Sequence, residues 1–230
     1  KKQQFIIFII FLFYVISMIK LKKTEILILI LTIVYLITAA IIYPYLPEQI
    51  ATHWNAQGIA DDFSPKLFGV LIMPFFFIFV LVIYSMFSRT EYFKKEEINK
   101  QLSTTITLSV LFLFLISILS LVYNLGIKFN MSYFMIPATS ALLIALGIIL
   151  KNVKTRNPFF GIRTPWTLLD QETWEKTHVF GSKVFIILGI LLLPSVFYLK
   201  HFVLLFMIAI LGSVVLIFVY SYHIYKKKKK

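Results

Sequence analysis

Two groups of side chains in this chain of 230 residues could support chemistry. The first comprises His53, Asp61 and Asp62, which together with His201 could offer nitrogen and oxygen ligands to a zinc ion. Zinc sites use three or four ligands, however, and His53 has no second histidine at the short spacing of a metalloprotease motif. Aspartates close to the start of a helix ordinarily act as caps. We therefore favour caps over ligands, and we expect no metal.

The second group comprises Arg163, Glu172 and His178, an anion binder with two candidate bases. This is the minimum for phosphoryl or acyl transfer. The chain nevertheless lacks a serine nucleophile elbow, a glycine-rich phosphate loop and paired catalytic carboxylates. A histidine on a helix face that also carries tryptophan is more often a packing group than a base. We expect no enzymatic activity and no cofactor.

The elements that must position these residues are membrane helices. The chain is 60% hydrophobic and only 14% charged, with a mean hydropathy of +0.89, which excludes an ordinary soluble domain. Apolar runs of this length cross a bilayer as helices, because backbone amides in lipid must be satisfied internally. The sequence predicts an all-α, polytopic transmembrane helix bundle with six core spans, at residues 25–43, 67–87, 105–123, 131–150, 184–199 and 202–220. A shorter run at residues 5–19 could form an extra span, and the sequence leaves this open.

The basic residues alternate between the connections of these spans. One set holds Lys20, Lys22, Lys23, Arg89, Lys94, Lys95, Lys100, Lys151, Lys154, Arg156, Arg163, Lys176, Lys183 and residues 226–230. The opposite set holds only Lys66, Lys128 and Lys200. Because short cytoplasmic loops are enriched in Lys and Arg, the first set predicts the cytoplasmic side. The net charge of +13 is therefore a topology signal, and we expect a multi-pass protein of the cell membrane with both ends of its core in the cytoplasm.

Two polar connections carry the candidate functional residues. In the outer one, residues 44–66, Ser64 is expected to cap the next helix, with Pro65 as its first residue. In the inner one, residues 151–183, Asp170 suits the N-cap of a short amphipathic helix that lies at the membrane interface and then turns into the bilayer. Trp166 and Trp174 are expected to anchor that helix at the interface.

Both connections resemble a known family. The outer segment LPEQIATHWNAQGIAD, at residues 46–61, resembles the N-terminal domain of unknown function that accompanies SdpI-like immunity proteins. The inner segment GIRTPWTL, at residues 161–168, followed by Trp174, Thr177, His178 and Gly181, resembles the C-terminal signature of the same SdpI immunity family. The closing SYHIYKK, at residues 221–227, is similar as well. The resemblance covers residues 22–230 and leaves residues 1–21 outside it.

The resemblance implies a six-span bacterial membrane protein that protects its producer against a secreted peptide toxin. It further implies that such a protein can sense the toxin and hold a cytosolic helix-turn-helix repressor at the membrane, with no direct contact to nucleic acid. Residues 1–21 would then be a short apolar segment, residues 22–123 an N-terminal membrane domain, and residues 124–230 an SdpI-like domain. The residues that match the signatures are candidate contacts for toxin or partner: His53, Trp54, Asn55, Gly58, Asp61, Arg163, Thr164, Pro165, Trp166, Thr167, Trp174, Thr177 and His178.

A rival hypothesis remains open at this point. The chain could be a transporter of small molecules or lipids, or a membrane protein with another function in the cell envelope. The predicted spans contain almost no ionisable residues of the kind that line proton or ion pathways, which disfavours coupled transport. The lipid bilayer itself is an expected partner under every hypothesis.

Overall fold

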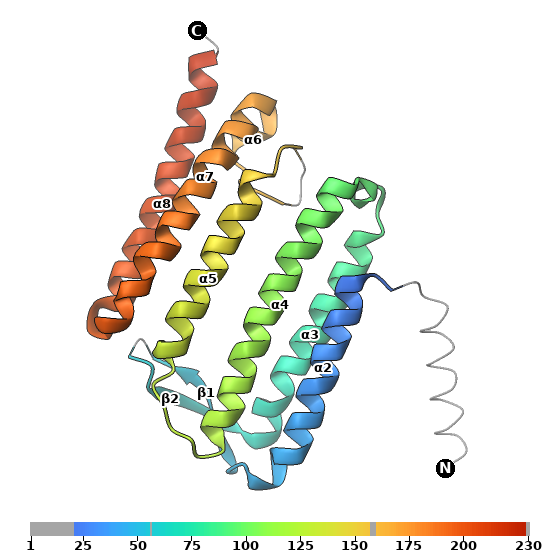
Figure 1. The fold of residues 1–230 in the computed structure, drawn as a ribbon, viewed down its shortest axis with the longest axis vertical. Coiled ribbons are helices and arrows are strands. Elements are labelled where there is room, and N and C mark those ends of the chain that lie inside the picture. The colour runs from blue at the N-terminus through green and yellow to red at the C-terminus, as the bar shows by residue number, and fades with distance from the viewer. Residues whose placement is uncertain (1–20, 56, 157–159, 229–230) are drawn as a thin grey trace.

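The computed structural model describes residues 21–55, 57–156 and 160–228, which include six long helices (Figure 1). Each is long and apolar enough to cross a bilayer. Their bounds are α2 (Lys23–Ile42), α3 (Lys66–Ser88), α4 (Glu96–Asn124), α5 (Ser132–Lys151), α7 (Gln171–Leu192) and α8 (Leu199–Lys228). The predicted polytopic helix bundle with six core spans is confirmed. The apolar run at residues 5–19 lies outside the described residues.

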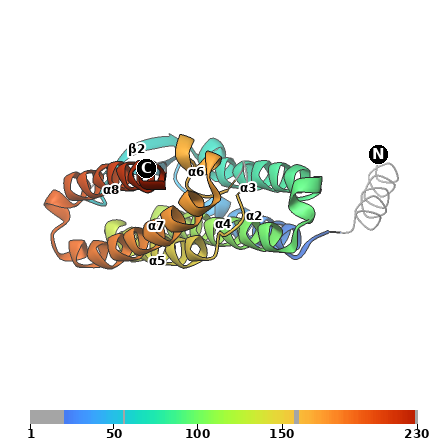
Figure 2. The same cartoon turned by 90° about the horizontal axis from the view of Figure 1, so that it is seen from above.

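The long helices alternate in direction, so successive connections lie at opposite ends of the bundle (Figure 1). The first three helices pack against one another, α7 packs against both α5 and α8, and α4 contacts α5. Seen from above, α3 and α8 lie on one side of the row formed by α2, α4 and α5 (Figure 2). The division into domains at residue 124 stays a prediction.

Apolar side chains lie both between the helices and on the outside of the bundle. Tyr35 of α2 meets Phe77 of α3 edge to face, with ring centroids 6.5 Å apart, and donates its hydroxyl hydrogen to the Val70 carbonyl at 3.1 Å. Many other large apolar side chains lie on the outside, such as Ile41 and Phe75, which are 66% and 74% exposed. Water would not tolerate so much apolar surface, whereas hydrocarbon covers it at no cost.

Glycines set the close approach of α5 and α7. A Cβ atom on Gly147 would lie 2.9 Å from the carbonyl oxygen of Ser182, and one on Gly189 would lie 2.8 Å from that of Ser140. Both distances are shorter than carbon and backbone oxygen tolerate. Small residues therefore let the two helix backbones meet, which is how helices gain van der Waals contact in lipid, where no hydrophobic force drives them together.

The outer connection contains a β-hairpin where the sequence analysis expected only a loop. Strands β1 (Gln49–Trp54) and β2 (Ala60–Pro65) pair antiparallel, after a short 3-10 helix at Tyr43–Tyr45. The prediction that Ser64 caps the next helix with Pro65 as its first residue is wrong, because both residues belong to β2 and α3 begins after them. The Ser64 hydroxyl instead lies 3.1 Å from the Thr52 hydroxyl across the hairpin.

The inner connection confirms one prediction and corrects another. After a five-residue helix α6 (Pro165–Leu169), helix α7 begins at Gln171 with Asp170 as its N-cap, as predicted. A 3-10 helix at Glu91–Lys94 lies in the separate connection between α3 and α4. The Asp170 carboxylate accepts the Thr173 amide hydrogen at 2.8 Å. The predicted turn from an interfacial helix into the bilayer is wrong, because α7 is continuous and ends at Leu192. A 3-10 helix at Leu193–Phe197 then leads into α8, so the fifth span starts and ends earlier than predicted.

Candidate functional site

The outer hairpin holds the His-Trp-Asn motif, and a distortion of the strands determines how these side chains point. Ala51 pairs with Phe63 and His53 with Asp62, and the register shifts between these pairs. Such a bulge adds a residue to one strand and re-aims the side chains beside it. The His53 Nδ1 atom lies 2.6 Å from an Asp61 carboxylate oxygen, and both side chains are exposed. The pair therefore lies on the outer surface, where such contacts contribute little to stability.

Asn55 and Gly58 shape the tip of the hairpin. The Asn55 side-chain oxygen accepts the amide hydrogens of Gln57 at 3.0 Å and Ile59 at 3.1 Å. Gly58 is buried and has φ of +72°, and a Cβ there would lie 1.9 Å from the side-chain oxygen of Asn130. Only glycine combines that backbone conformation with so close a neighbour. These two residues of the motif thus have structural roles.

The hairpin is fastened to the helices on both sides of the α4–α5 connection. Asn124, at the end of α4, accepts the Ala51 amide hydrogen at 2.8 Å and donates to the Ala51 carbonyl at 3.0 Å. Asn130 donates to the Gln57 carbonyl at 2.6 Å, and the Met131 amide donates to the Gly58 carbonyl at 3.1 Å. The hairpin therefore lies across the end of the bundle (Figure 1).

A cavity of about 560 Å³ lies between this hairpin and the helices. Its size falls in the range of small-molecule sites. Trp54 reaches it from the hairpin and meets Tyr123 of α4 edge to face, with ring centroids 5.5 Å apart. The lining residues are Tyr35, Thr52, His53, Trp54, Asn55, Gly58, Gly69, Ile72, Met73, Ile116, Ser117, Ser120, Met131, Ser132 and Met135. We call this the hairpin cavity.

The described residues do not form the zinc site that His53, Asp61, Asp62 and His201 could have offered. Asp61 lies beside His53, but the Asp62 carboxylate turns back to accept the Phe63 amide hydrogen at 2.8 Å. Among the described residues, no three His, Cys, Asp or Glu side chains come close enough to share an ion. The side chain of His201, the remaining candidate ligand, lies outside the described residues.

At the opposite end of the bundle, the inner signature is folded onto α7 by His178. The Ile162 amide donates to His178 Nε2 at 2.8 Å, and Nδ1 donates to the Trp174 carbonyl at 2.7 Å. Gly161 precedes this contact with φ of +108°, and a Cβ there would lie 2.3 Å from Nε2. Because Nε2 accepts a hydrogen bond, the Nδ1 atom carries the proton of a neutral ring. Both nitrogens are engaged by backbone groups and the ring is buried, so this arrangement leaves no free lone pair for a general base.

Two threonines and a tryptophan complete this turn at residues 161–167, which we call the inner turn. Thr164 caps α6 and exchanges hydrogen bonds with Thr167, whose hydroxyl also donates to the Ile162 carbonyl at 2.9 Å. The Trp174 indole donates to the Val153 carbonyl at 3.0 Å and is fully buried, so the prediction that it anchors at the interface is wrong. Val153 and Gly161 lie against its indole ring. Thr177 is buried beside it on α7.

Other signature residues remain on the surface of the inner end. Arg163 and Pro165 are exposed, and Leu168 and Leu169, which follow them, are 47% and 67% exposed. Trp166 is half-buried and packs on α8, with its ring centroid 4.8 Å from that of Phe218. The inner signature therefore divides into a buried scaffold and a small exposed surface. Only the second could contact a partner in this conformation.

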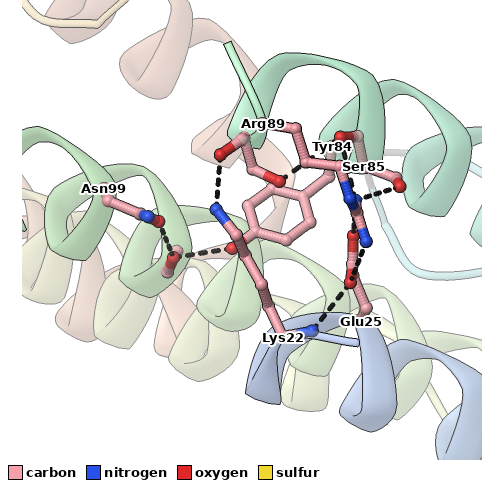
Figure 3. Close-up of polar contacts among 8 residues, drawn as sticks. Lys22, Glu25, Tyr84, Ser85, Arg89 and Asn99 are labelled. Carbon is pink, nitrogen blue, oxygen red and sulfur yellow. Dashed lines mark hydrogen bonds and ion pairs between the residues drawn. The ribbon is translucent and has the colours of Figure 1, made fainter. Parts of the chain in front are cut away.

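A charged cluster at the same end was missed by the sequence analysis. Glu25, in the first turn of α2, is fully buried and forms an ion pair with Arg89 at the end of α3, and it also accepts the Lys22 amide hydrogen at 2.7 Å (Figure 3). The Lys22 ammonium donates to the Ser88 carbonyl. Glu25 raises the pKa of Arg89, and burial lowers the pKa of Lys22. The first span thus contains a buried carboxylate, but a paired one that joins two helices.

Comparisons with known proteins find matches that include the same two segments. A family model for the SdpI/YfhL protein family matches residues 154–221, and one for a domain of unknown function (DUF1648) matches residues 29–78. The Immunity protein SdpI of Bacillus subtilis (strain 168) is 30% identical over 208 residues, which are 90% of this chain and 97% of that protein. The chain belongs to the SdpI family. No solved structure gives a significant match.

The SdpI/YfhL model covers the inner turn, and the DUF1648 model covers the hairpin. These two segments of the SdpI-family protein lie at opposite ends of the bundle (Figure 1). Both segments of this SdpI-family protein could be located from the sequence, but the polar residues that join distant parts of the bundle could not. Asn124, Asn130, Glu25 and Arg89 each bond to a segment at least 64 positions away. A lone polar residue at the end of an apolar run was the only signal that the sequence offered for them.

Proposed function

We propose that this protein gives its producer immunity to a secreted peptide toxin, and that it does so without enzymatic activity. The observation that carries the proposal is the identity with Immunity protein SdpI, which extends over nearly the whole length of that protein. The geometry is consistent with a binding role. The hairpin offers exposed His53 and Asp61 beside a cavity, whereas His178, the candidate base, is occupied by backbone groups.

The proposed orientation has the hairpin outside the cell and the inner turn in the cytoplasm. It rests on the basic residues, because the lysine-rich and arginine-rich connections all lie at the end of the bundle that carries the inner turn (Figure 1). Both ends of the six-span core would then be cytoplasmic, and the lysines that end α8 would lie near anionic headgroups. A toxin arriving from outside would meet the hairpin first.

Survival of toxin-treated cells tests the proposal. A strain sensitive to the toxin against which the Bacillus subtilis relative protects would express this chain or carry an empty vector. We expect survival only with the chain, and equal killing would reject immunity to that toxin. The variant Gly161→Ala, which disrupts the inner turn, should lose protection, whereas Gly126→Ala should keep it, because a Cβ there meets nothing within 4 Å.

We also propose that the protein senses the toxin and holds a helix-turn-helix repressor at the membrane. The supporting observation is the exposed surface formed by Arg163, Pro165, Leu168 and Leu169 beside a rigid turn. Sensing requires that toxin binds one arrangement of the helices more tightly than another, since a ligand shifts an equilibrium only by its differential affinity. A repressor encoded beside the gene should move to the membrane fraction on toxin addition, and Leu169→Asp should prevent this without loss of immunity.

A further inference from the structure

The lining of the hairpin cavity has an unusual composition. Three of the six methionines in the chain contribute to it: Met73 from α3, Met135 from α5 and Met131 from the residue just before α5. Methionine is unbranched and polarisable, so it adapts to irregular shapes and packs well against aromatic rings. Binding surfaces that must accommodate ligands of varied shape use it for this reason. The lining is therefore suited to an apolar ligand group.

The same lining is electrically neutral. It contains no lysine, arginine, aspartate or glutamate, and its single histidine, His53, lies against the exposed Asp61. The polar members are hydroxyl and amide side chains, among them Thr52, Ser117 and Ser120. A charged group would lose its hydration in such a site without gaining a partner. Apart from His53, the lining offers no charged partner to an ionised ligand group and favours apolar groups that carry neutral hydrogen-bonding atoms.

The position of the cavity favours a peptide over a lipid. Its wall includes the hairpin residues Trp54 and Asn55, which continue directly into the exposed outer surface at the hairpin tip. The hairpin backbone is fixed by Asn124 and Asn130, so the wall is a built surface. A peptide that contacts the hairpin from the aqueous side therefore meets residues that also line the cavity, without first entering the bilayer.

We infer that the hairpin cavity binds an uncharged, apolar side chain of the secreted peptide toxin, with the adjacent hairpin surface contacting the rest of the peptide. This inference rests on the proposed function and names the part of the molecule that recognises the toxin. The methionines and Trp54 contact the inserted side chain. Hydroxyl groups of the lining bond to the neutral polar atoms beside it.

Single cysteines provide the test, because the chain contains none of its own. Ser120→Cys places a thiol in the cavity wall, and Glu175→Cys places one on the exposed surface at the other end of the bundle. Each full-length variant is put in lipid nanodiscs and alkylated with N-ethylmaleimide, with and without the toxin against which the Bacillus subtilis relative protects. At a toxin concentration ten times its dissociation constant, alkylation of Ser120→Cys should slow about tenfold. Alkylation of Glu175→Cys should not change.

The outcomes separate this inference from the proposed function. Protection of Ser120→Cys, but not of Glu175→Cys, from alkylation supports the cavity as the toxin site. If cells that express the wild type nevertheless die, immunity is rejected and the cavity site is not. Unchanged alkylation of Ser120→Cys overturns the inference, whether or not the wild type gives immunity. Slow alkylation of Ser120→Cys even without toxin would also overturn the inference, because lipid or protein would then already fill the cavity.

A cavity-filling variant gives a second measurement. Ser120→Phe adds a ring to the cavity wall, and Leu211→Phe places the same ring on the lipid-facing side of α8, where the side chain is 59% exposed. Ser120→Phe should reduce toxin binding to nanodiscs at least tenfold, and Leu211→Phe should leave it unchanged. Equal toxin binding by a folded Ser120→Phe variant and the wild type would overturn the inference.

Discussion

Asn124 of α4 bonds to the backbone of Ala51 in both directions, accepting its amide hydrogen at 2.8 Å and donating to its carbonyl at 3.0 Å. The side-chain amide thereby takes the place of a neighbouring strand at the free edge of β1. Ala51 is fully buried, so no water could replace these bonds. Together with Asn130, this side chain joins the hairpin to the bundle.

Replacing Asn124 should therefore loosen the hairpin. Asn124→Leu keeps the size of the side chain but leaves a buried amide and a buried carbonyl unpaired, which costs about 2 kcal/mol or more of unfolding free energy. Asn152→Leu is the control, since the Asn152 side chain is exposed and makes one long contact, at 3.4 Å. Unfolding in detergent by increasing sodium dodecyl sulfate measures both. Equal stability of the two variants would show that the Asn124 bonds contribute nothing.

Two glycines with similar backbone angles allow the inner turn to be tested. Gly161 and Gly126 have φ of +108° and +101°, so alanine at either position is strained by about 1 to 3 kcal/mol. At Gly126 a Cβ meets nothing within 4 Å, but at Gly161 it would lie 2.3 Å from His178 Nε2. Gly161→Ala should therefore lower the thermal unfolding temperature well below that of Gly126→Ala. Matching temperatures would mean that the turn is not closed on His178.

The α5–α7 contact predicts a second contrast between glycines. Gly189→Ala forces a Cβ against the Ser140 carbonyl at 2.8 Å, and neither backbone can move without separating the helices. Gly212→Ala on α8 meets nothing within 4 Å and should be neutral or stabilise by up to about 1 kcal/mol through helix propensity. We expect opposite signs in the two unfolding measurements. A neutral Gly189→Ala would contradict the close packing.

The stability contributed by Asp170 should depend on pH. A hydrogen bond from Lys228, together with the Thr173 amide, lowers the pKa of this carboxyl from 3.8 to about 2. Because the folded pKa is depressed, the contribution is complete above about pH 4 and is lost as the pH falls from there towards 2. Asp170→Asn keeps the helix cap but removes the charge.

Thermal unfolding between pH 2 and pH 7 measures this effect. The wild type should be more stable than Asp170→Asn near neutral pH, and the two should converge near pH 2. Asp62→Asn, which removes an exposed carboxylate from the hairpin, serves as the control and should not converge in this way. A difference between the wild type and Asp170→Asn that persists unchanged to pH 2 would exclude the ion pair with Lys228 as its cause.

The proposed orientation can be measured in intact cells. Gln57→Cys at the hairpin tip and Glu175→Cys on α7 each place one exposed thiol in a chain without native cysteine. A membrane-impermeant maleimide should label Gln57→Cys in intact cells, and Glu175→Cys only after the cells are lysed. Labelling of both from outside, or of Glu175→Cys alone, would refute the proposed orientation and with it any route from toxin to cytosol.

The order of the amino acids alone predicts the number of core spans, the ends at which the basic residues gather, the position of both signature segments and the Asp170 cap. These properties depend on runs of neighbouring residues, so hydropathy, charge and capping preferences suffice to read them.

The fold of the chain was needed to show that the outer segment is a hairpin, that Trp174 is buried, and that a cavity lies beneath His53 and Trp54. It also decided that Glu25 meets Arg89, 64 positions away along the chain. Strand pairing, burial and ion pairing depend on which distant residues pack together, and a bundle in lipid sets those contacts by the fit of helix surfaces. Local residue order carries no direct record of that fit.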